Sequence, residues 1–319
     1  MSNQELAPHE VACANTDGRA QLIEPRAVPL GGPRAMTVRR TLPQRARSLI
    51  GAWCFVDHYG PDDVGATGGM RVDGHPHTGL QTVSWLFSGE IEHRDTAGHH
   101  AMVRPGELNL MTAGSGIAHS EHSTPDTQRL HGVQLWVALP ESDRLTTPGF
   151  RHYAPTVLEH DGTTALVFLG TLLGNTSPVE TFTPLLGAEL TIAPGRFELD
   201  VDPGFEHGVL VDSGDMRVAG ITATSGQLVY QPPGNSRLVL ETTAGCRVLL
   251  LGGRPLGERI TMWWNFIGRS HEDITEYRAQ WQAAREPGAA PGRFGPFPPQ
   301  WANTLPAPEL PNVRLKPRG

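Results

Sequence analysis

Residues 68–80, GGMRVDGHPHTGL, place His75 and His77 on either side of a single proline. In an extended strand successive side chains point to opposite faces, so both imidazoles would point to the same side. The proline between them donates no backbone hydrogen bond, which suits a strand at the edge of a sheet. This stretch therefore predicts a strand that presents two nitrogen donors to one face.

A second stretch, GIAHSEH at residues 116–122, repeats the arrangement with His119 and Glu121. Two such pairs on facing strands would bring three imidazoles and one carboxylate around one point. That set of donors suits a first-row divalent metal ion with open positions for water or substrate. The neighbouring His122 would face the other way on the same strand, so we expect it outside the site.

Further histidines lie close to these motifs in the sequence. Eight of the fourteen histidines in the chain fall between His75 and His131. The segment EIEHRDTAGHH is typical of a hairpin, and we expect its histidines to be loop residues and not ligands. They are His93, His99 and His100.

Short apolar runs separated by turn residues continue on both sides of the motifs. The chain holds 37 glycines and 28 prolines, and many short strands at regular spacing indicate an all-β sandwich or barrel. The clearest runs are QTVSWLF (81–87), GVQLWVALP (132–140), TALVFLG (164–170) and CRVLLLGG (246–253).

An internal repeat extends this prediction to two barrels. The run PGELNLMTAGSGIAHSE (105–121) resembles SGQLVYQPPGNSRLVLE (225–241), which begins 120 residues later (225 − 105). Duplication of a β-barrel explains both the repeat and the length of 319 residues. In this alignment Val239 takes the place of His119, and the second half has no HxH motif. We therefore expect a single site, in the first half.

One helix is predicted near the C-terminus. Ser270 is a suitable N-cap, with Asp273 three residues later, and apolar residues then follow at helical spacing. The Pro- and Gly-rich tail beyond carries three aromatic residues, so we expect it to dock on the body of the protein. The apolar helical positions are Ile274, Tyr277 and Trp281, and the tail aromatics are Phe294, Phe297 and Trp301.

These patterns divide the chain into four parts. We expect an N-terminal arm (1–25), a metal-binding barrel (26–160), a degenerate second barrel with the helix (161–286) and a docked tail (287–319).

Composition narrows the classes of function. A net charge of −7 argues against direct, non-specific binding of nucleic acid. The three cysteines, Cys13, Cys54 and Cys246, lie far apart and suggest no disulfide framework, which fits a reducing cytoplasm. The polar N-terminal segment is not typical of a signal peptide, and no apolar run approaches the length of a membrane span. We expect a cytoplasmic protein without a membrane partner.

The motifs GGMRVDGHPHTGLQTVSWLFSGEIEHRD and PGELNLMTAGSGIAHSEH resemble the pirin family of the cupin superfamily. In particular, the chain is similar to bacterial pirins that resemble quercetin 2,3-dioxygenases, over roughly residues 33–265. The resemblance implies two tandem cupin barrels (double-stranded β-helix or jelly-roll folds) with one short C-terminal helix. It also implies one metal in the N-terminal barrel, bound by His75, His77, His119 and Glu121, and none in the second.

The resemblance implies iron(II) foremost as the metal, with nickel, manganese, cobalt, copper and zinc as alternatives. In the enzymatic interpretation a flavonol binds through its deprotonated oxygen, Glu121 takes the proton as the catalytic residue, and dioxygen opens the ring with loss of carbon monoxide. In the alternative interpretation the protein is a redox- or metal-sensing module that modulates a transcription factor or a metabolic enzyme through protein contacts. The sequence leaves both interpretations open.

One position departs from the family pattern. Gln81 stands four residues after His77, where the general cupin motif has a glutamate, so the carboxylate has to come from Glu121. Gln81 is expected to hydrogen-bond a ligand or the substrate instead.

Four further residues are candidates for the surroundings of the metal. Asp57 and His58 fall where pirins line the mouth of the pocket, and we expect them to support the ligands or to handle protons. Trp85 and Trp136 are candidates to stack on a flat substrate, with packing in the barrel core as the alternative.

Overall fold

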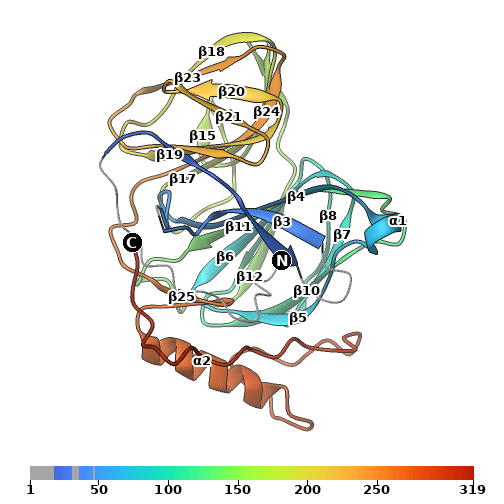
Figure 1. The fold of residues 1–319 in the computed structure, drawn as a ribbon. Helices are drawn as coiled ribbons and strands as arrows, with labels where there is room; N and C mark the ends of the chain where they lie inside the picture. Colours follow the sequence, from blue (N-terminus) through green and yellow to red (C-terminus); the bar gives the residue numbers. More distant parts are fainter. Residues whose placement is uncertain (1–17, 31–35, 46) are drawn as a thin grey trace.

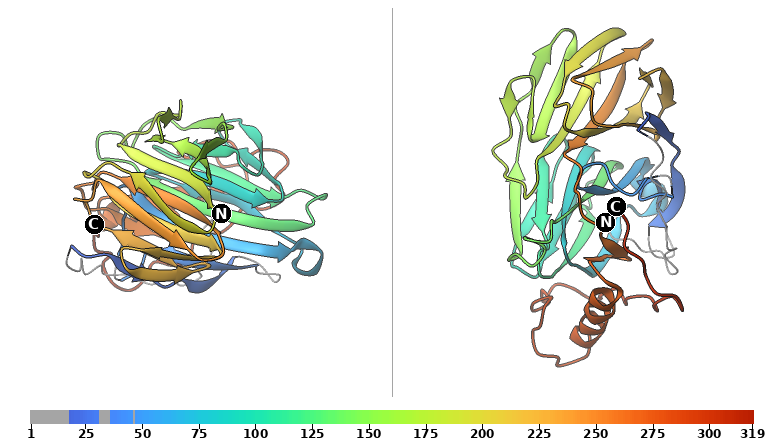
Figure 2. Two further views of the ribbon diagram at one scale, coloured as in Figure 1. Left: turned by 90° about the horizontal axis from the view of Figure 1, so that it is seen from above. Right: turned by 90° about the vertical axis from the view of Figure 1, so that its left-hand side faces the viewer.

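The computed structural model describes residues 18–30, 36–45 and 47–319. Two β-barrels lie one above the other, and helix α2 (His271–Ala284) packs on the far end of the N-terminal barrel (Figure 1). Figure 2 shows the same arrangement from two further sides. The prediction of an all-β protein with two tandem cupin barrels and a C-terminal helix is confirmed.

The N-terminal barrel consists of two sheets in the described part of the chain. One has the strand order β12-β9-β6-β11-β4-β3-β2, and the other has the order β5-β10-β7-β8. The strands are β2 (Arg26–Leu30), β3 (Met36–Leu42), β4 (Trp53–Asp63), β5 (Arg71–His77), β6 (Leu80–Ser88), β7 (Ile91–Asp95), β8 (His100–Val103), β9 (Leu108–Thr112), β10 (Ile117–Ser123), β11 (Arg129–Ala138) and β12 (Gly149–Tyr153).

The second barrel repeats this strand order, except that the strand at one edge, β1, comes from the N-terminal segment of the chain. Its sheets have the orders β1-β22-β19-β24-β17-β14-β13 and β18-β23-β20-β21. The strands are β1 (Gln21–Ile23), β13 (Leu158–His160), β14 (Thr163–Leu169), β17 (Leu185–Ile192), β18 (Gly195–Asp200), β19 (Glu206–Ser213), β20 (Asp215–Val218), β21 (Ile221–Thr224), β22 (Leu228–Gln231), β23 (Arg237–Thr242) and β24 (Cys246–Gly253).

The repeat alignment is shifted by one residue on β23. Val239 is only half-buried, whereas its neighbours Leu238 and Leu240 pack in the core of the second barrel together with Phe197 and Leu199. Since side chains alternate along a strand, Leu238 and Leu240 occupy the inward positions that His119 and Glu121 occupy on β10. Apolar side chains therefore fill the interior where the first barrel carries its polar donors.

The N-terminal segment does not stay with its own barrel. Residues 1–17 of the expected arm lie outside the described residues, but β1 pairs with β22 of the second barrel, from Gln21 opposite Tyr230 to Ile23 opposite Leu228. The chain then returns to the first barrel at β2.

A shared core joins the two barrels. Trp53, Val83 and Leu135 of the first barrel pack in one cluster with Leu210 and Leu249 of the second. The indole of Trp53 donates to the carbonyl oxygen of Gly252 at 3.0 Å. Apolar burial of this kind contributes about 25 cal/mol per Å², so the shared cluster stabilises the contact between the two barrels.

Helix α2 forms as the sequence predicts. The Ser270 hydroxyl accepts from the backbone of Asp273, whose carboxylate in turn accepts from the backbone of Ser270. The helix buries Ile274, Tyr277 and Trp281 against the hairpin of β25 (Thr261–Trp263) and β26 (Phe266–Gly268). Three short elements complete the described fold: α1 (Val64–Thr67), β15 (Thr171–Leu172) and β16 (Asn175–Thr176).

The tail after residue 287 lies against the helix and then along β5. Phe294 and Phe297 contact the ring of Trp281 with centroid distances of 5.4 Å each. The backbone N–H of Leu305 donates to the carbonyl oxygen of Gly74 at 2.8 Å. The tail therefore covers the outside of the strand that carries the HPH motif.

Candidate metal centre

Strands β5 and β10 bring the two histidine motifs together. They pair in antiparallel fashion, with His119 directly opposite His75 and Ile117 opposite His77. Directly opposed residues share a face, so all three imidazoles point into the N-terminal barrel. One ring nitrogen from each lies within 4.8 Å of the others, and all three side chains are fully buried.

Backbone carbonyls orient the rings of two of these histidines. Nδ1 of His75 lies 2.9 Å from the carbonyl oxygen of Asp73, and Nδ1 of His77 lies 3.1 Å from that of Asn265. A carbonyl only accepts, so each Nδ1 carries the proton and each Nε2 presents a lone pair. Within the described chain Nε2 of His75 is buried with no hydrogen-bond partner. Histidines that bind metals are typically held in this way.

The two remaining Nε2 atoms face each other. Nε2 of His77 and Nε2 of His119 are 3.1 Å apart. Two nitrogens that bind one metal ion at about 2.0–2.1 Å each lie roughly 3 Å apart when they occupy adjacent positions. The distance between these two nitrogens, together with a lone pair on each, therefore fits a divalent metal ion bound between them.

Glu121 lies beside His119, and the group of donor atoms that contains it shares only His119 with the cluster of His75, His77 and His119. Glu121 lies opposite His93 on β7, and the donor atoms of Glu121, His93 and His119 fall within 4.8 Å of one another. The Ser84 hydroxyl lies 3.1 Å from Oε1 of Glu121 and 2.9 Å from the amide of Gln134. That hydroxyl has one proton, which goes to Glu121 when the Gln134 amide is turned to donate to Ser84.

Burial keeps the histidines in the form that binds metals. Removal from water, followed by the proximity of other imidazoles, holds the pKa of His75 and the pKa of His119 well below the ordinary histidine value. Burial lowers the pKa of His77 in the same direction. Neutral imidazoles at pH 7 are ready to bind a metal without first releasing a proton.

The expectation that His93 is a loop residue is wrong. It lies within β7 and is 3% exposed, with Nδ1 3.3 Å from Nδ1 of His119. The signal for this was present in EIEHRD, because Ile91, His93 and Asp95 alternate with more exposed residues as in a half-buried strand. His99 follows in the turn, and His100 is exposed at the start of β8.

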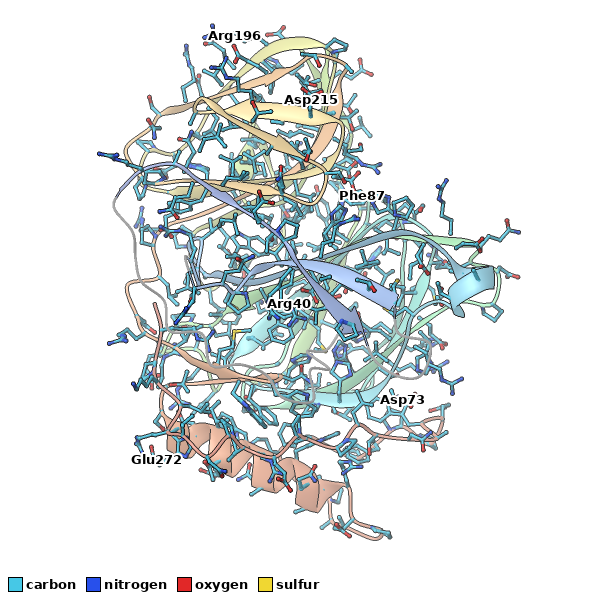
Figure 3. The ribbon with its side chains drawn as sticks, viewed as in Figure 1. Arg40, Asp73, Phe87, Arg196, Asp215 and Glu272 are labelled. Carbon is cyan, nitrogen blue, oxygen red and sulfur yellow. The ribbon has the colours of Figure 1, made fainter. Side chains whose placement is uncertain are left out.

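Two of the predicted neighbours lie inside the N-terminal barrel. The ring of Trp136 stacks on Phe55 at 4.0 Å and meets His77 edge-on at 5.0 Å, so it forms a wall of the site. Asp57 is fully buried and accepts from Arg40, which Figure 3 labels, at 2.6 and 2.7 Å. Asp57 is thus held in an ion pair within the barrel.

The structure does not bring Gln81, Trp85 or His58 to the histidine cluster. On β6 the inward residues are Thr82 and Ser84, so Gln81 and Trp85 face the second barrel. The indole of Trp85 donates to Glu189 at 2.7 Å, and its ring contacts Phe168 of that barrel.

Gln81 and His58 have other neighbours. The amide of Gln81 donates to the Thr112 hydroxyl at 2.9 Å, at the side of a cavity of about 510 Å³ that Phe150 and Phe182 also line. Nε2 of His58 lies 2.8 Å from Asp212 of the second barrel. Both side chains therefore belong to the seam between the barrels.

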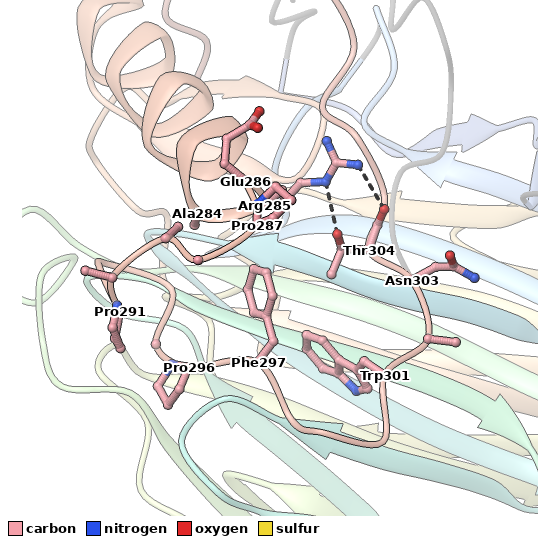
Figure 4. Close-up of a pocket in the computed structure, with 15 residues that line it drawn as sticks. Ala284, Arg285, Glu286, Pro287, Pro291, Pro296, Phe297, Trp301, Asn303 and Thr304 are labelled. Atoms are coloured by element: carbon pink, nitrogen blue, oxygen red, sulfur yellow. Dashed lines mark hydrogen bonds between the residues drawn. The ribbon is translucent and has the colours of Figure 1, made fainter.

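A further cavity of about 420 Å³ lies between the end of α2 and the tail (Figure 4). Arg285 closes one side of it by donating to the hydroxyl and the carbonyl oxygen of Thr304 at 3.0 and 3.2 Å. Its lining contains no histidine or cysteine and one carboxylate, Glu286, so it has no set of metal donors.

Comparison with known proteins agrees with this architecture. The family model for pirin matches residues 35–137, and that for the pirin C-terminal cupin domain matches residues 188–287. A protein of Pseudomonas aeruginosa, named provisionally as a quercetin 2,3-dioxygenase, is 42% identical over 91% of this chain and 90% of its own length. A pirin-like protein of Caulobacter vibrioides is 35% identical over 82% of this chain and 94% of its own.

Among solved structures, the quercetin 2,3-dioxygenase from Acinetobacter baumannii is similar with a TM-score of 0.86 and 37% identity, over 93% of this chain and 98% of that one. In the described residues of this chain, neither helix has the length and apolar character that a membrane span requires.

Proposed function

Because this chain belongs to the pirin family, we propose that its N-terminal barrel is a mononuclear metal centre bound by His75, His77, His119 and Glu121. We further propose that the loaded protein is an enzyme of the quercetin 2,3-dioxygenase type, which cleaves flavonols with dioxygen. Iron(II) is the proposed metal, and nickel, manganese, cobalt, copper and zinc are the alternatives.

A single observation carries the metal centre. Two Nε2 atoms, of His77 and His119, face each other at 3.1 Å in a site that is closed to bulk water. With the proton of His119 on Nδ1, toward His93, two lone pairs face each other at that distance and repel each other unless a cation lies between them. The unpartnered Nε2 of His75 is directed to the same cluster. The proposal that the substrate is a flavonol is based on similar proteins, two of which are named as quercetin 2,3-dioxygenases.

When bound, the metal ion supplies Lewis acidity toward an enolic oxygen of the substrate. The side chains of the barrel accept the substrate proton, orient the carboxylate and form an apolar wall. Glu121 is the base that accepts the proton of the substrate hydroxyl, and the Ser84 hydroxyl orients the carboxylate through its hydrogen bond. The buried wall formed by Trp136 keeps the site apolar on one side, which strengthens every charge interaction inside it.

The test is turnover by protein of known metal content. Metal-free protein is loaded anaerobically with iron(II) or with each alternative ion, quercetin and dioxygen are added, and loss of the flavonol absorbance is followed. His119→Ala should abolish metal binding and turnover. His122→Ala on the same strand is the matched control, because that side chain is 34% exposed and faces away. A fully loaded protein that leaves the flavonol panel unchanged rejects the enzymatic function and retains the metal centre.

A further inference from the structure

We propose that His93, anchored by Asp95, is a positioning residue for His119: it holds the proton of His119 on Nδ1 and so keeps Nε2 available to the metal ion. The inference rests on the proposed metal centre and adds to it a residue that does not itself bind the metal. It follows from the donors and acceptors in a series of hydrogen bonds that joins three side chains: Asp95, His93 and His119.

This series of hydrogen bonds begins at Asp95, a residue that is 2% exposed. Its Oδ1 accepts from the backbone N–H groups of Ala97 at 2.9 Å and of His99 at 3.0 Å, which fixes the side chain in the turn after β7. Its Oδ2 lies 3.2 Å from Nε2 of His93. An ionised carboxylate can only accept, so Nε2 of His93 carries a proton.

Burial alone would raise the pKa of Asp95, but hydrogen bonds from His93 and His99 outweigh it and hold that pKa below the ordinary value. The acceptor that begins this series of hydrogen bonds, Asp95, is therefore a charged carboxylate. Hydrogen bonds to a charged acceptor are stronger than neutral ones, so the orientation of His93 is well defined.

The second link joins His93 to the metal site. Nδ1 of His93 and Nδ1 of His119 are 3.3 Å apart, so one donates to the other. A neutral His93 whose single proton lies on Nε2 toward Asp95 can only accept at Nδ1, so the proton of this pair lies on Nδ1 of His119. Nε2 of His119 is then unprotonated, and it faces Nε2 of His77, which has its own proton on Nδ1.

His93 itself is outside the set of ligands. Its Nδ1 contacts Nδ1 of His119, whereas Nε2 of His119 faces Nε2 of His77, so His93 lies at the ring nitrogen that does not face the cluster. The ring of Phe150 packs on His93 with a centroid distance of 4.9 Å, which holds the imidazole in the plane that the two hydrogen bonds need. A partner of this kind sets the tautomer of a ligand and increases its basicity.

Three variants test the inference through metal affinity. His93→Leu keeps much of the volume and removes the acceptor, and we expect it to weaken Zn(II) and Ni(II) binding by about 10- to 100-fold in competition with a chelator. His93→Gln restores one acceptor and one donor, and we expect it to recover most of that loss. The matched control is His99→Leu, because His99 also bonds to Asp95 but does not contact His119.

The result that overturns the proposal is wild-type affinity in His93→Leu, or an equal loss in His93→Leu and His99→Leu, which would indicate a general packing effect. A measurement without variants covers the case in which His93→Leu does not fold. Nitrogen-15 NMR should find the His119 proton on Nδ1 in both the metal-free and the Zn(II)-loaded protein. A proton on Nε2 in the metal-free protein overturns the inference. Absence of any metal binding by the wild type would reject the proposed centre separately.

Discussion

The substitution Asp212→Asn probes the polar network that joins the two barrels. Oδ1 of Asp212 accepts from His58 at 2.8 Å and lies 2.7 Å from Nε2 of His131, and Oδ2 accepts from Nε of Arg247 at 2.8 Å. An asparagine keeps one carbonyl oxygen for the two histidines but directs an NH₂ group at the guanidinium. The change therefore removes one charged hydrogen bond and weakens two others without altering the volume.

The magnitude follows from burial. A hydrogen bond to a charged group contributes about 1.5–3 kcal/mol, and removing one partner of a buried ion pair costs about 3–5 kcal/mol. The side chain of Asp212 is fully buried, but that of Arg247 is 27% exposed, so water can solvate the guanidinium in part. We expect Asp212→Asn to lower the free energy of unfolding by about 3 kcal/mol at pH 7, with metal affinity unchanged.

The assay is urea unfolding followed by fluorescence, and the control is Asp200→Asn in the same barrel. Asp200 also accepts from an arginine, Arg237, but the two side chains are 82% and 56% exposed. Water and salt screen a surface pair of this kind, so the control should lose little stability. Equal losses in the two variants would refute the reasoning, because burial would then have no influence.

The difference between wild type and Asp212→Asn should also depend on pH. Burial would raise the pKa of Asp212, but hydrogen bonds from His131 and His58 outweigh it and hold that pKa below its ordinary value. The stabilisation is therefore fully present above the unfolded pKa of about 4 and is lost as the pH falls through the native pKa. The two proteins should converge in stability in strong acid.

Three further predictions concern other parts of the molecule. In Gly74→Ala the new Cβ would lie 2.4 Å from the ring of Trp301, so the tail should lift and become sensitive to limited proteolysis; wild-type resistance would contradict the packing. Burial lowers the pKa of His207 to about 4, so stability should fall by about 3 kcal/mol between pH 6.5 and pH 4, and His207→Leu should lack that share of the decline. Zn(II) at 100 times its Kd should stabilise the protein by about 2.7 kcal/mol, and His75→Ala should abolish this gain.

The repeated short-range patterns predicted an all-β protein with a duplicated barrel, and the resemblance to pirins implied the cupin fold of each barrel. Alternation in HPH and HSE places pairs of donors on one face of a strand whatever the rest of the chain does, because the period of a strand is fixed by its backbone. The capping box at Ser270 and the stripe that includes Trp281 likewise depend on residues three to seven positions apart. The repeat predicted two barrels, although its alignment at Val239 was one residue out of phase.

Which face of a strand looks into the barrel was decided by the tertiary structure. Residues 80–86 of β6 are all buried, as are residues 130–138 of β11, because the second barrel covers the outer face of this sheet. Burial on both faces removes the alternation of polar and apolar residues that would distinguish inside from outside. The sequence therefore does not reveal that Gln81 and Trp85 face the second barrel while Ser84 faces Glu121.

Contacts between distant segments decided the rest of the site. The carbonyl oxygen of Asn265, 188 residues from His77, sets the proton of that ring, and Asp212 reaches His58 across 154 residues. The role of His93 depends on the register of β7 against β10, which sets it beside His119. The sequence by itself determined the types of donor and their pairing on strands. Only the tertiary structure decided their partners, because a hydrogen bond to a backbone carbonyl of another segment leaves no trace in the local pattern of residues.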